Sequence, residues 1–197
     1  MTIRWVVSTV VLAWLPCVIA GPGARAAAAA SFTLTDAQKQ QALSFGARSV
    51  TQTVFDAEWS VQNGAGERAT VLTPFHRVAL AARHAAFRNE PLKPSEPERV
   101  LSQERDRLVL LAELRGRRED FARFYVPELR VGDQTLKALF VQNERTALKQ
   151  EGDRYLARCR YEFPAKELSG TARVSLVVRD ADGRETSRFT IDLASMR

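Results

Sequence analysis

Two histidines are the first candidates for acid–base or metal chemistry, because the ordinary pKa of histidine lies closest to neutral pH. His76 and His84 fall eight residues apart on one expected helix. At about 100° per residue, this spacing separates them by about 80° around the axis and by about two turns along it. Such a separation does not suit joint ligation of one ion. We therefore expect ordinary surface or capping histidines, with a metal or acid–base role as the alternative.

Carboxylate pairs are the second candidates, because two carboxyl groups can act as acid and base in glycoside hydrolysis. Asp56 and Glu58 form one pair along the chain, and Glu96 and Glu98 form another. Pairs at this spacing occur in any chain of comparable charge content. They give no specific support to glycosidase-like chemistry, which depends on a geometry that spacing alone does not define.

The segment Asp180-Ala181-Asp182-Gly183, with Glu185 after it, resembles part of a calcium-binding loop. Such a loop needs more oxygen ligands at alternate positions than this segment supplies. Asp-Gly between two alternating apolar segments is instead a strong hairpin signal. We expect a plain hairpin turn here.

Nucleophile and phosphate-binding patterns are weak in this chain. It contains no Gly-x-Ser-x-Gly motif, and Ser169-Gly170-Thr171 falls where a turn is expected. Cys159 lies on the apolar face of an expected strand, which is typical of a buried structural thiol. Gly64-Ala65-Gly66 lacks the following helix that a phosphate-cradling loop requires. The sequence therefore assigns no catalytic, cofactor-binding or metal-binding residue, and we expect no cofactor.

Residues 1–30 have the layout of a cleavable secretory signal peptide. A short positive start leads into an apolar run from Trp5 to Ala20, and a segment of small residues follows. A membrane anchor would need about 20 strongly apolar residues, and this run is shorter and is interrupted by Pro16. Cleavage after Ala26 and cleavage after Ala30 both fit. We expect a periplasmic or secreted mature protein that keeps no stable transmembrane segment.

The charge pattern bears on the kind of partner. The formal net charge is +6, and it falls to +4 once the expected leader, with Arg4 and Arg25 and no acidic residue, is removed. The remaining basic residues are interspersed with acidic ones, as in the stretch 104–107. Nucleic-acid binding would need basic residues gathered on one face, so this pattern favours a solvated mixed-charge surface. The partners that we expect are an envelope protein or an anionic envelope glycolipid, not nucleic acid.

The segment that follows the leader predicts mainly helices over residues 31–105. Thr35-Asp36-Ala37-Gln38 is a capping box that begins a helix, with Gly46 as its C-cap. Val50 to Val61 alternates imperfectly and is interpreted as a strand that ends at the turn Asn63–Gly66. The start of the domain is thus predicted to be one helix followed by one strand.

A second helix begins at Pro74, capped by Thr73. Its apolar stripe is rich in alanine, so we expect it to pack tightly on a sheet; the stripe consists of Phe75, Val78, Ala79, Ala82 and Ala86. Residues 89–97 contain three prolines and form a linker. A short helix from about Pro97 to Gln103 follows.

Residues 106–197 predict mainly strands. Leu108 to Leu114 is a nearly continuous apolar run that suits a central strand. Phe121 to Val126, Glu128 to Val131 and Thr135 to Val141 are shorter candidates, and Gly132-Asp133 joins the last two as a hairpin. Pro127 disfavours a central-strand position at that point.

The best-defined strands lie near the end of the chain. Tyr155 to Phe163 alternates between an apolar face that holds Cys159 and a charged face that holds Arg158, Arg160 and Glu162. The last pair of strands, on either side of Asp182-Gly183, is the clearest hairpin in the sequence.

Together these patterns predict one α+β domain over residues 31–197, with N-terminal helices packed on a mainly antiparallel β-sheet or β-sandwich in the C-terminal half. No motif ties the chain to a family. Because β-rich exported domains without polar constellations commonly act through their surfaces, we expect a small non-enzymatic module that binds a protein or a cell-envelope component. The alternative is an extracytoplasmic, hydrolase-like enzyme whose site is assembled only in the fold.

Overall fold

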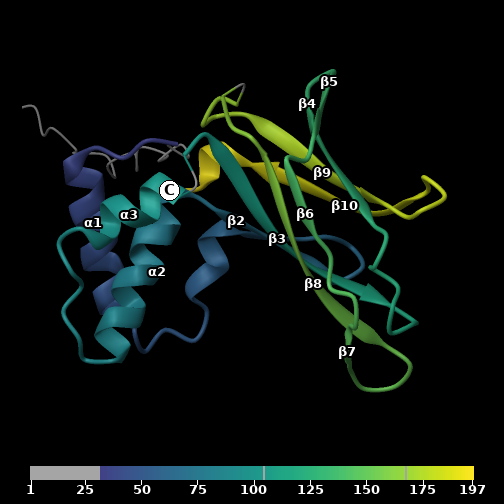
Figure 1. The fold of residues 1–197 in the computed structure, drawn as a ribbon, viewed down its shortest axis with the longest axis horizontal. Coiled ribbons are helices and arrows are strands. Elements are labelled where there is room, and N and C mark those ends of the chain that lie inside the picture. The colour runs from purple at the N-terminus through teal and green to yellow at the C-terminus, as the bar shows by residue number, and fades with distance from the viewer. Residues whose placement is uncertain (1–31, 104, 167) are drawn as a thin grey trace, which may run out of the picture.

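The computed structural model describes residues 32–103, 105–166 and 168–197, so the predicted signal peptide lies outside the described residues. Within these ranges the chain forms three α-helices and two antiparallel sheets, which confirms the α+β class. The helices gather at one end of the molecule and the sheets extend from it (Figure 1). In the described part of the chain, no helix is long and apolar enough to span a membrane.

Helix α1 (Asp36–Arg48) begins at the predicted capping box. The backbone N–H of Gln38 donates to Oγ1 of Thr35 at 3.3 Å, and the backbone N–H of Thr35 donates to Oε1 of Gln38 at 2.9 Å. The prediction that Gly46 ends the helix is wrong, because α1 continues to Arg48 and Ser49 is its C-cap. Gly46 is buried against the backbone of Ala79 in the next helix, and a side chain there would not fit.

The predicted strand from Val50 to Val61 is also wrong for most of its length. Residues Phe55–Trp59 form the 3-10 helix η1, and only Ser60–Gln62 pair as strand β1. The short helical rise keeps Phe55 and Trp59 close together, and their ring centroids lie 5.7 Å apart. A strand would point residues four positions apart to one face but about 13 Å from each other. The gain from this aromatic contact explains the helical conformation.

Strand β2 (Arg68–Leu72) has no counterpart in the sequence-based prediction. It pairs with β1 around the predicted turn at Asn63–Gly66. Residues 69–72 of this strand are all buried, so the two-residue alternation that marks a half-exposed strand is hidden.

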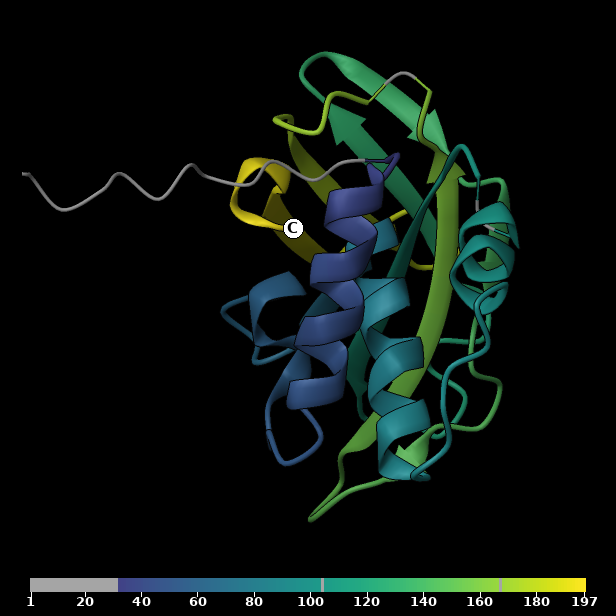
Figure 2. The ribbon, with the colours of Figure 1, turned by 90° about the vertical axis from the view of Figure 1, so that its left-hand side faces the viewer.

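Helix α2 (Pro74–Phe87) begins as predicted, with the backbone N–H of His76 donating to Oγ1 of Thr73 at 3.1 Å. Its alanine side approaches α1, not a sheet, which corrects the expected packing partner: the space above Gly46 is filled by Ala79 and Ala82. Figure 2 shows α1 and α2 side by side. Helix α3 (Glu96–Gln103) follows the linker, as the sequence predicts.

The larger sheet has the strand order β1-β2-β3-β8-β6, and β7 also pairs with β8. Strand β3 (Arg107–Gly116) lies between β2 and β8, which confirms the predicted central strand. The remaining members are β6 (Phe140–Gln142), β7 (Leu148–Lys149) and β8 (Tyr155–Pro164).

The smaller sheet has the order β10-β9-β4-β5. The predicted hairpins are both present: β4 (Val126–Val131) with β5 (Gln134–Lys137), and β9 (Arg173–Arg179) with β10 (Glu185–Asp192). Pro127 pairs with Val178 of β9 but lies beyond the residues that β5 pairs, so its missing N–H leaves no gap on the β5 side.

Two predicted strands in this region are wrong. Residues 121–124 are turns, and the ring of Phe121 packs at 5.7 Å from that of Tyr125 and fills the space beside Gly116. The predicted strand from Thr135 to Val141 is split, because β5 belongs to the smaller sheet and β6 to the larger one. The backbone N–H of Leu139 donates to the carbonyl of Glu162 at 2.7 Å, which marks the point where the chain joins the larger sheet.

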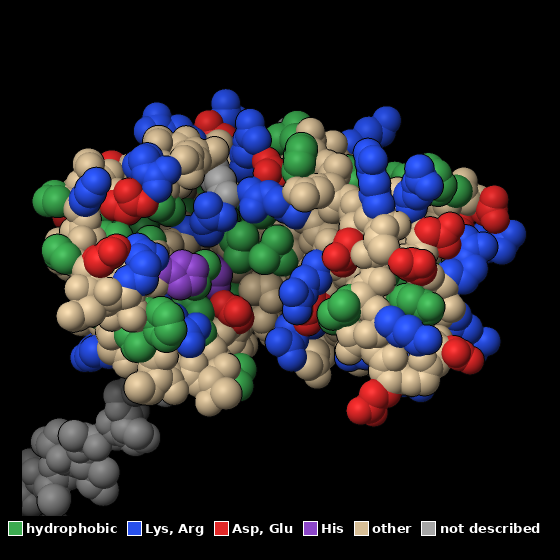
Figure 3. Space-filling view, turned by 60° about the horizontal axis from the view of Figure 1, so that its bottom comes forward, with side chains coloured by type: hydrophobic (Ala, Val, Ile, Leu, Met, Phe, Trp, Pro, Cys, Tyr) green, Lys and Arg blue, Asp and Glu red, His purple; other side chains and the backbone are tan. Residues whose placement is uncertain are grey.

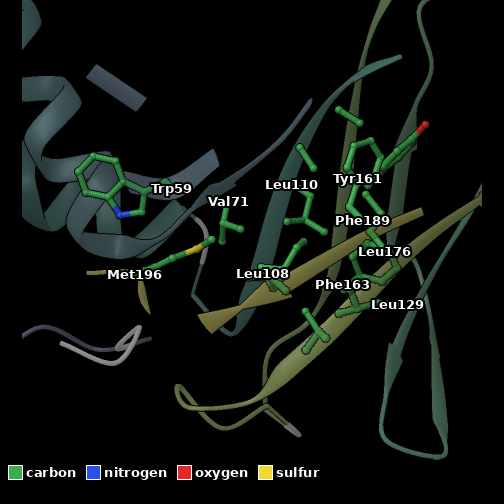
Figure 4. Packing of buried hydrophobic residues seen from close by; sticks show 14 of the residues in the cluster. Trp59, Val71, Leu108, Leu110, Leu129, Tyr161, Phe163, Leu176, Phe189 and Met196 are labelled. Carbon is green, nitrogen blue, oxygen red and sulfur yellow. The ribbon is translucent and has the colours of Figure 1, made fainter. Parts of the chain in front are cut away.

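The core lies between the two sheets and continues toward the helices (Figure 4). Leu108, Leu110, Tyr161 and Phe163 of the larger sheet share one buried cluster with Leu129, Leu176 and Phe189 of the smaller sheet. Trp59 has no exposed surface and lies in the core from the 3-10 helix η1, not from the strand that the sequence predicts for this segment.

Candidate functional site

The outer face of the larger sheet, which points away from the core, carries most of the candidate functional side chains. Strand register places residues of β2, β3, β8 and β6 in cross-strand rows on this face. The first row is Arg68, Glu113 and Arg158, the second is Thr70, Leu111, Arg160 and Gln142, and the third is Leu72, Val109, Glu162 and Phe140.

A groove lies over the first two rows, with α2 as its wall. Its volume is about 590 Å³, within the range of about 300–1,000 Å³ that is usual for small-molecule sites. Side chains of α2 and of η1 complete the lining, namely Asp56, His76, Arg77 and Leu80. Figure 3 shows the hollow between the helical part and the sheets, with Lys, Arg and hydrophobic side chains around it.

Leu111 lies at the centre of the groove floor and is 38% exposed. Val109, two residues earlier on the same face of β3, is fully buried. The outer face is thus covered at Val109 and Glu162 of its third row and open at Leu111 of its second. An exposed leucine in a concave site offers apolar surface that a ligand can remove from water.

Arginines give the groove an excess of positive charge. Arg68, Arg77, Arg158 and Arg160 line it together with two carboxylates, Asp56 and Glu113. Nε of Arg158 lies 3.5 Å from Oε1 of Glu113. Among the described residues, no carboxylate lies within 4 Å of the Arg68 guanidinium, so its charge is available to a ligand.

Glu162, in the third row, anchors the arginines at the covered side of the groove. It accepts hydrogen bonds from Arg107 at 2.7 Å and from Arg160 at 2.9 and 3.0 Å. Burial tends to raise the pKa of Glu162, but the hydrogen bonds from these two arginines outweigh burial and lower it. The carboxylate is therefore an internal partner that fixes Arg160 at the groove rim, although its place in the alternating strand predicts a solvent-facing charge.

His76 is not the surface histidine that the sequence predicts. Its side chain is 2% exposed, and its Nε2 lies 2.7 Å from Oδ1 of Asp56. An ionised carboxylate only accepts, so Nε2 carries the proton and donates it. Nδ1 is buried and has no hydrogen-bond partner within the described residues. The hydrogen bond from His76 lowers the pKa of Asp56, while burial acts in the opposite direction.

His84 lies away from this pair, near the exposed end of α2, and the structure does not bring the two histidines together around a shared site. In the ranges that the structure describes, no group of three or more His, Cys, Asp or Glu side chains is placed to hold a metal ion. Glu58, the sequence neighbour of Asp56, instead pairs with Arg197 at the opposite end of the chain.

The other sequence candidates take structural positions. Cys159 is 2% exposed on the inner face of β8, as the alternation predicts, and burial raises the pKa of its thiol. Asp180 Oδ1 accepts the backbone N–H groups of Asp182 and Arg184 at 3.0 and 2.9 Å, which confirms a plain hairpin turn. Ser169 and Thr171 share a hydroxyl hydrogen bond of 2.8 Å in an exposed turn.

The remaining acidic and glycine candidates also have structural roles, in ion pairs of the helices and in a turn. Glu96 pairs with Arg99 on α3, and Glu98 pairs with Lys39 of α1 at 2.6 Å. Gly64-Ala65-Gly66 forms the turn before β2, with Gly66 at a positive φ of 74°.

Sequence reasoning missed the groove because two of its signals were hidden. The nearly continuous apolar run of β3 does not reveal that Leu111 points outward, and β2, which supplies Arg68 and Thr70, was not recognised as a strand. The sequence did reveal the charged face of β8, which holds Arg158 and Arg160. The strand register shows that their cross-strand partners on β3 are Glu113 and Leu111.

No protein-family model and no curated protein matches this chain. A solved structure similar to it is that of a novel protein of unknown function from Burkholderia pseudomallei K96243. The two share 12% sequence identity with a TM-score of 0.43, over 82% of this chain and 91% of that chain.

Proposed function

We propose that this protein is an exported, non-enzymatic module that binds a protein or a cell-envelope component through the groove between α2 and the outer face of the larger sheet. The observation that carries the proposal is the exposed Leu111 at the centre of a concave site whose rim holds arginines. An apolar centre with a polar rim is the usual anatomy of a recognition surface.

The geometry at His76 favours binding over hydrolysis. A general base needs a ring nitrogen that can reach the substrate, either directly or through one water. Nε2 of His76 is engaged by Asp56, and Nδ1 is buried and has no hydrogen-bond partner within the described residues. The hydrolase-like alternative would have to use another base, and the pair His76–Asp56 is better explained as a link between α2 and η1.

Export is supported by the layout of residues 1–30, in which positive charge, an apolar run and small residues follow one another. Expression with the native leader should give a mature protein that begins after Ala26 or Ala30, in the extracytoplasmic fraction. Intact-mass analysis of the fractions tests this. Protein in the membrane that retains residues 1–20 would contradict export by cleavage.

The binding role is tested by capture from the cell envelope of the producing organism. The tagged mature protein should retain an envelope component that a Leu111→Asp variant loses, since the new carboxylate replaces the apolar surface at the centre of the groove floor and competes for the neighbouring arginines. Val126→Asp is the matched control, because Val126 is an exposed strand residue of the smaller sheet, 52% exposed and outside the groove. Circular dichroism verifies that both variants fold. Retention of the same component by Leu111→Asp would show that the groove is not the binding surface.

A further inference from the structure

We propose that the ligand of the groove is a single-chain lipid with an acidic head group, the chemistry of a long-chain fatty acid. This inference rests on the proposed function, because it names the class of molecule that the same groove binds. Three features of the groove carry it: the leucines of its floor and wall, a lining that holds no Phe, Tyr or Trp among the described residues, and the charge balance of its first row.

Leucine side chains on the floor and the wall offer a path for one alkyl chain. Leu111 of β3 lies at the centre, and Leu72 of β2 and Leu80 of α2 also line the groove. These three side chains come from the sheet floor and from the helical wall, so a narrow chain between them contacts apolar surface on two sides. Burial of such surface is favourable by about 25 cal/mol per Å² removed from water.

The kind of apolar surface favours an alkyl chain over a protein partner. The groove is lined by residues within the described ranges, and none of them is Phe, Tyr or Trp. Interface positions that contribute most to protein binding are enriched in tryptophan and tyrosine as well as arginine. The apolar side chains exposed in the groove are aliphatic and lie beside arginines, which matches a flexible aliphatic chain with an acidic head.

The first row provides the site for the head group. Glu113 lies between Arg68 and Arg158 in the strand register, so one carboxylate faces two guanidinium groups. Within this row the positive charge exceeds the negative charge by one, which matches a head group of one negative charge. Guanidinium groups bind carboxylates with paired hydrogen bonds, and both arginines lie on the groove face of the sheet.

The distance between head and tail sites is short enough for one molecule. Successive residues on one face of a strand are two positions apart, so the first row lies about 7 Å from the second. A carboxylate at Arg68 and Arg158 thus places the first carbons of its chain beside Thr70 and Leu111. The chain then continues toward Leu80 and the wall formed by α2.

The inference is tested by calorimetric titration of the folded mature protein with dodecanoate, below the concentration at which it forms micelles. Dodecanoate should bind with a stoichiometry of one, and dodecyltrimethylammonium, which has the same chain and the opposite charge, should bind at least about tenfold more weakly. Acetate, which has the head group without the chain, should give no measurable binding, because the apolar contact is then lost.

Substitutions separate the two parts of the site. The double variant Arg68→Gln, Arg158→Gln should weaken dodecanoate binding by about tenfold, because two exposed charge interactions are removed. Arg173→Gln, Arg184→Gln is the matched control, since both arginines are exposed and pair with aspartates on the β9–β10 hairpin. Leu111→Asn, which removes the apolar side chain without adding charge, should weaken binding by a similar factor through the alkyl chain. Thermal unfolding verifies that each variant keeps the fold.

Two results would overturn the inference: equal affinity for the anionic and the cationic amphiphile, or dodecanoate binding that the Arg68→Gln, Arg158→Gln variant leaves unchanged. Failure of dodecanoate to bind, combined with loss of the envelope component by Leu111→Asp, would overturn the lipid inference and leave the groove as the binding surface. Retention of that component by Leu111→Asp would instead count against the proposed function itself.

Discussion

The indole Nε1 of Trp59 donates a hydrogen bond of 2.7 Å to the backbone oxygen of Arg197, across 138 positions of the chain. The hydroxyl of Thr73 donates to the same oxygen and also accepts the backbone N–H of His76. One oxygen atom thus joins η1 to the N-cap of α2. The helix that forms the groove wall is therefore positioned by residues that lie far apart in the sequence.

The first prediction concerns the side chain of Arg197. Its guanidinium makes two hydrogen bonds with Glu58 and lies 4.7 and 4.9 Å from the ring centroids of Phe45 and Phe75. Arg197→Ala should lower the free energy of unfolding by about 1–2 kcal/mol, because one partly exposed ion pair and two cation–π contacts are lost. Urea unfolding measures this. Arg184→Ala, on an exposed hairpin, is the control, and equal effects of the two changes would contradict the contacts described.

The second prediction tests the close approach of α1 and α2. A Cβ at Gly46 would lie 2.0 Å from the carbonyl oxygen of Ala79, so Gly46→Ala requires the helices to move apart. We expect a loss of about 1–3 kcal/mol in the free energy of unfolding, as for other overpacked sites. Gly64→Ala is the matched control, because nothing described lies within 4 Å of its Cβ position. Thermal unfolding of the two variants should therefore differ, and equal midpoints would show that the two helices are packed less closely.

The third prediction concerns the buried thiol. Because burial raises the pKa of Cys159, little reactive thiolate is present, and the side chain is 2% exposed. A thiol reagent should label the native protein slowly and the denatured protein quickly. Cys159→Ser should cost about 1–3 kcal/mol through a buried hydroxyl, without abolishing ligand binding. Rapid native labelling, or a covalent dimer through Cys159, would contradict the inward orientation.

The fourth prediction is a pH dependence at Asp56. The hydrogen bond from His76 lowers the pKa of Asp56 in the folded state, with smaller contributions from the charges of His76, Arg83 and Arg68. A lowered pKa means that the folded state binds the proton less readily, so the interaction stabilises the protein above the ordinary aspartate pKa of about 3.9. This stabilisation is lost as the pH falls through the lowered value.

Asp56→Asn tests this sign. The wild type should exceed the variant in free energy of unfolding by about 0.2–1 kcal/mol between pH 5 and pH 7, a modest value because the Asp56 side chain is half exposed. The difference should shrink as the pH falls below about 4. Asp153→Asn serves as the control for removal of an exposed carboxylate. A difference that grows on acidification would contradict the assigned direction.

Local chemistry determined a large part of the fold. The capping box at Thr35 and the cap and proline at Thr73-Pro74 set the starts of α1 and α2, because these side chains satisfy or remove N–H groups of the first turn. Asp182-Gly183 set the last hairpin, and strict alternation placed Cys159 in the core. Each of these signals depends on residues that are close together in the sequence, so it can be predicted from the sequence alone.

The tertiary structure decided the features that depend on distant partners. Gly46 lies inside α1, where Ala79 of α2 packs against it. Phe55 and Trp59 lie in a 3-10 helix, where their rings pack against each other. Asp56 forms its hydrogen bond with His76, and Glu58 its ion pair with Arg197, only in the folded chain, because each partner is distant in the sequence. The groove has the same origin: Leu111 faces outward and meets arginines of β2 and β8 because strand register, a property of pairs of strands, places them in adjacent rows.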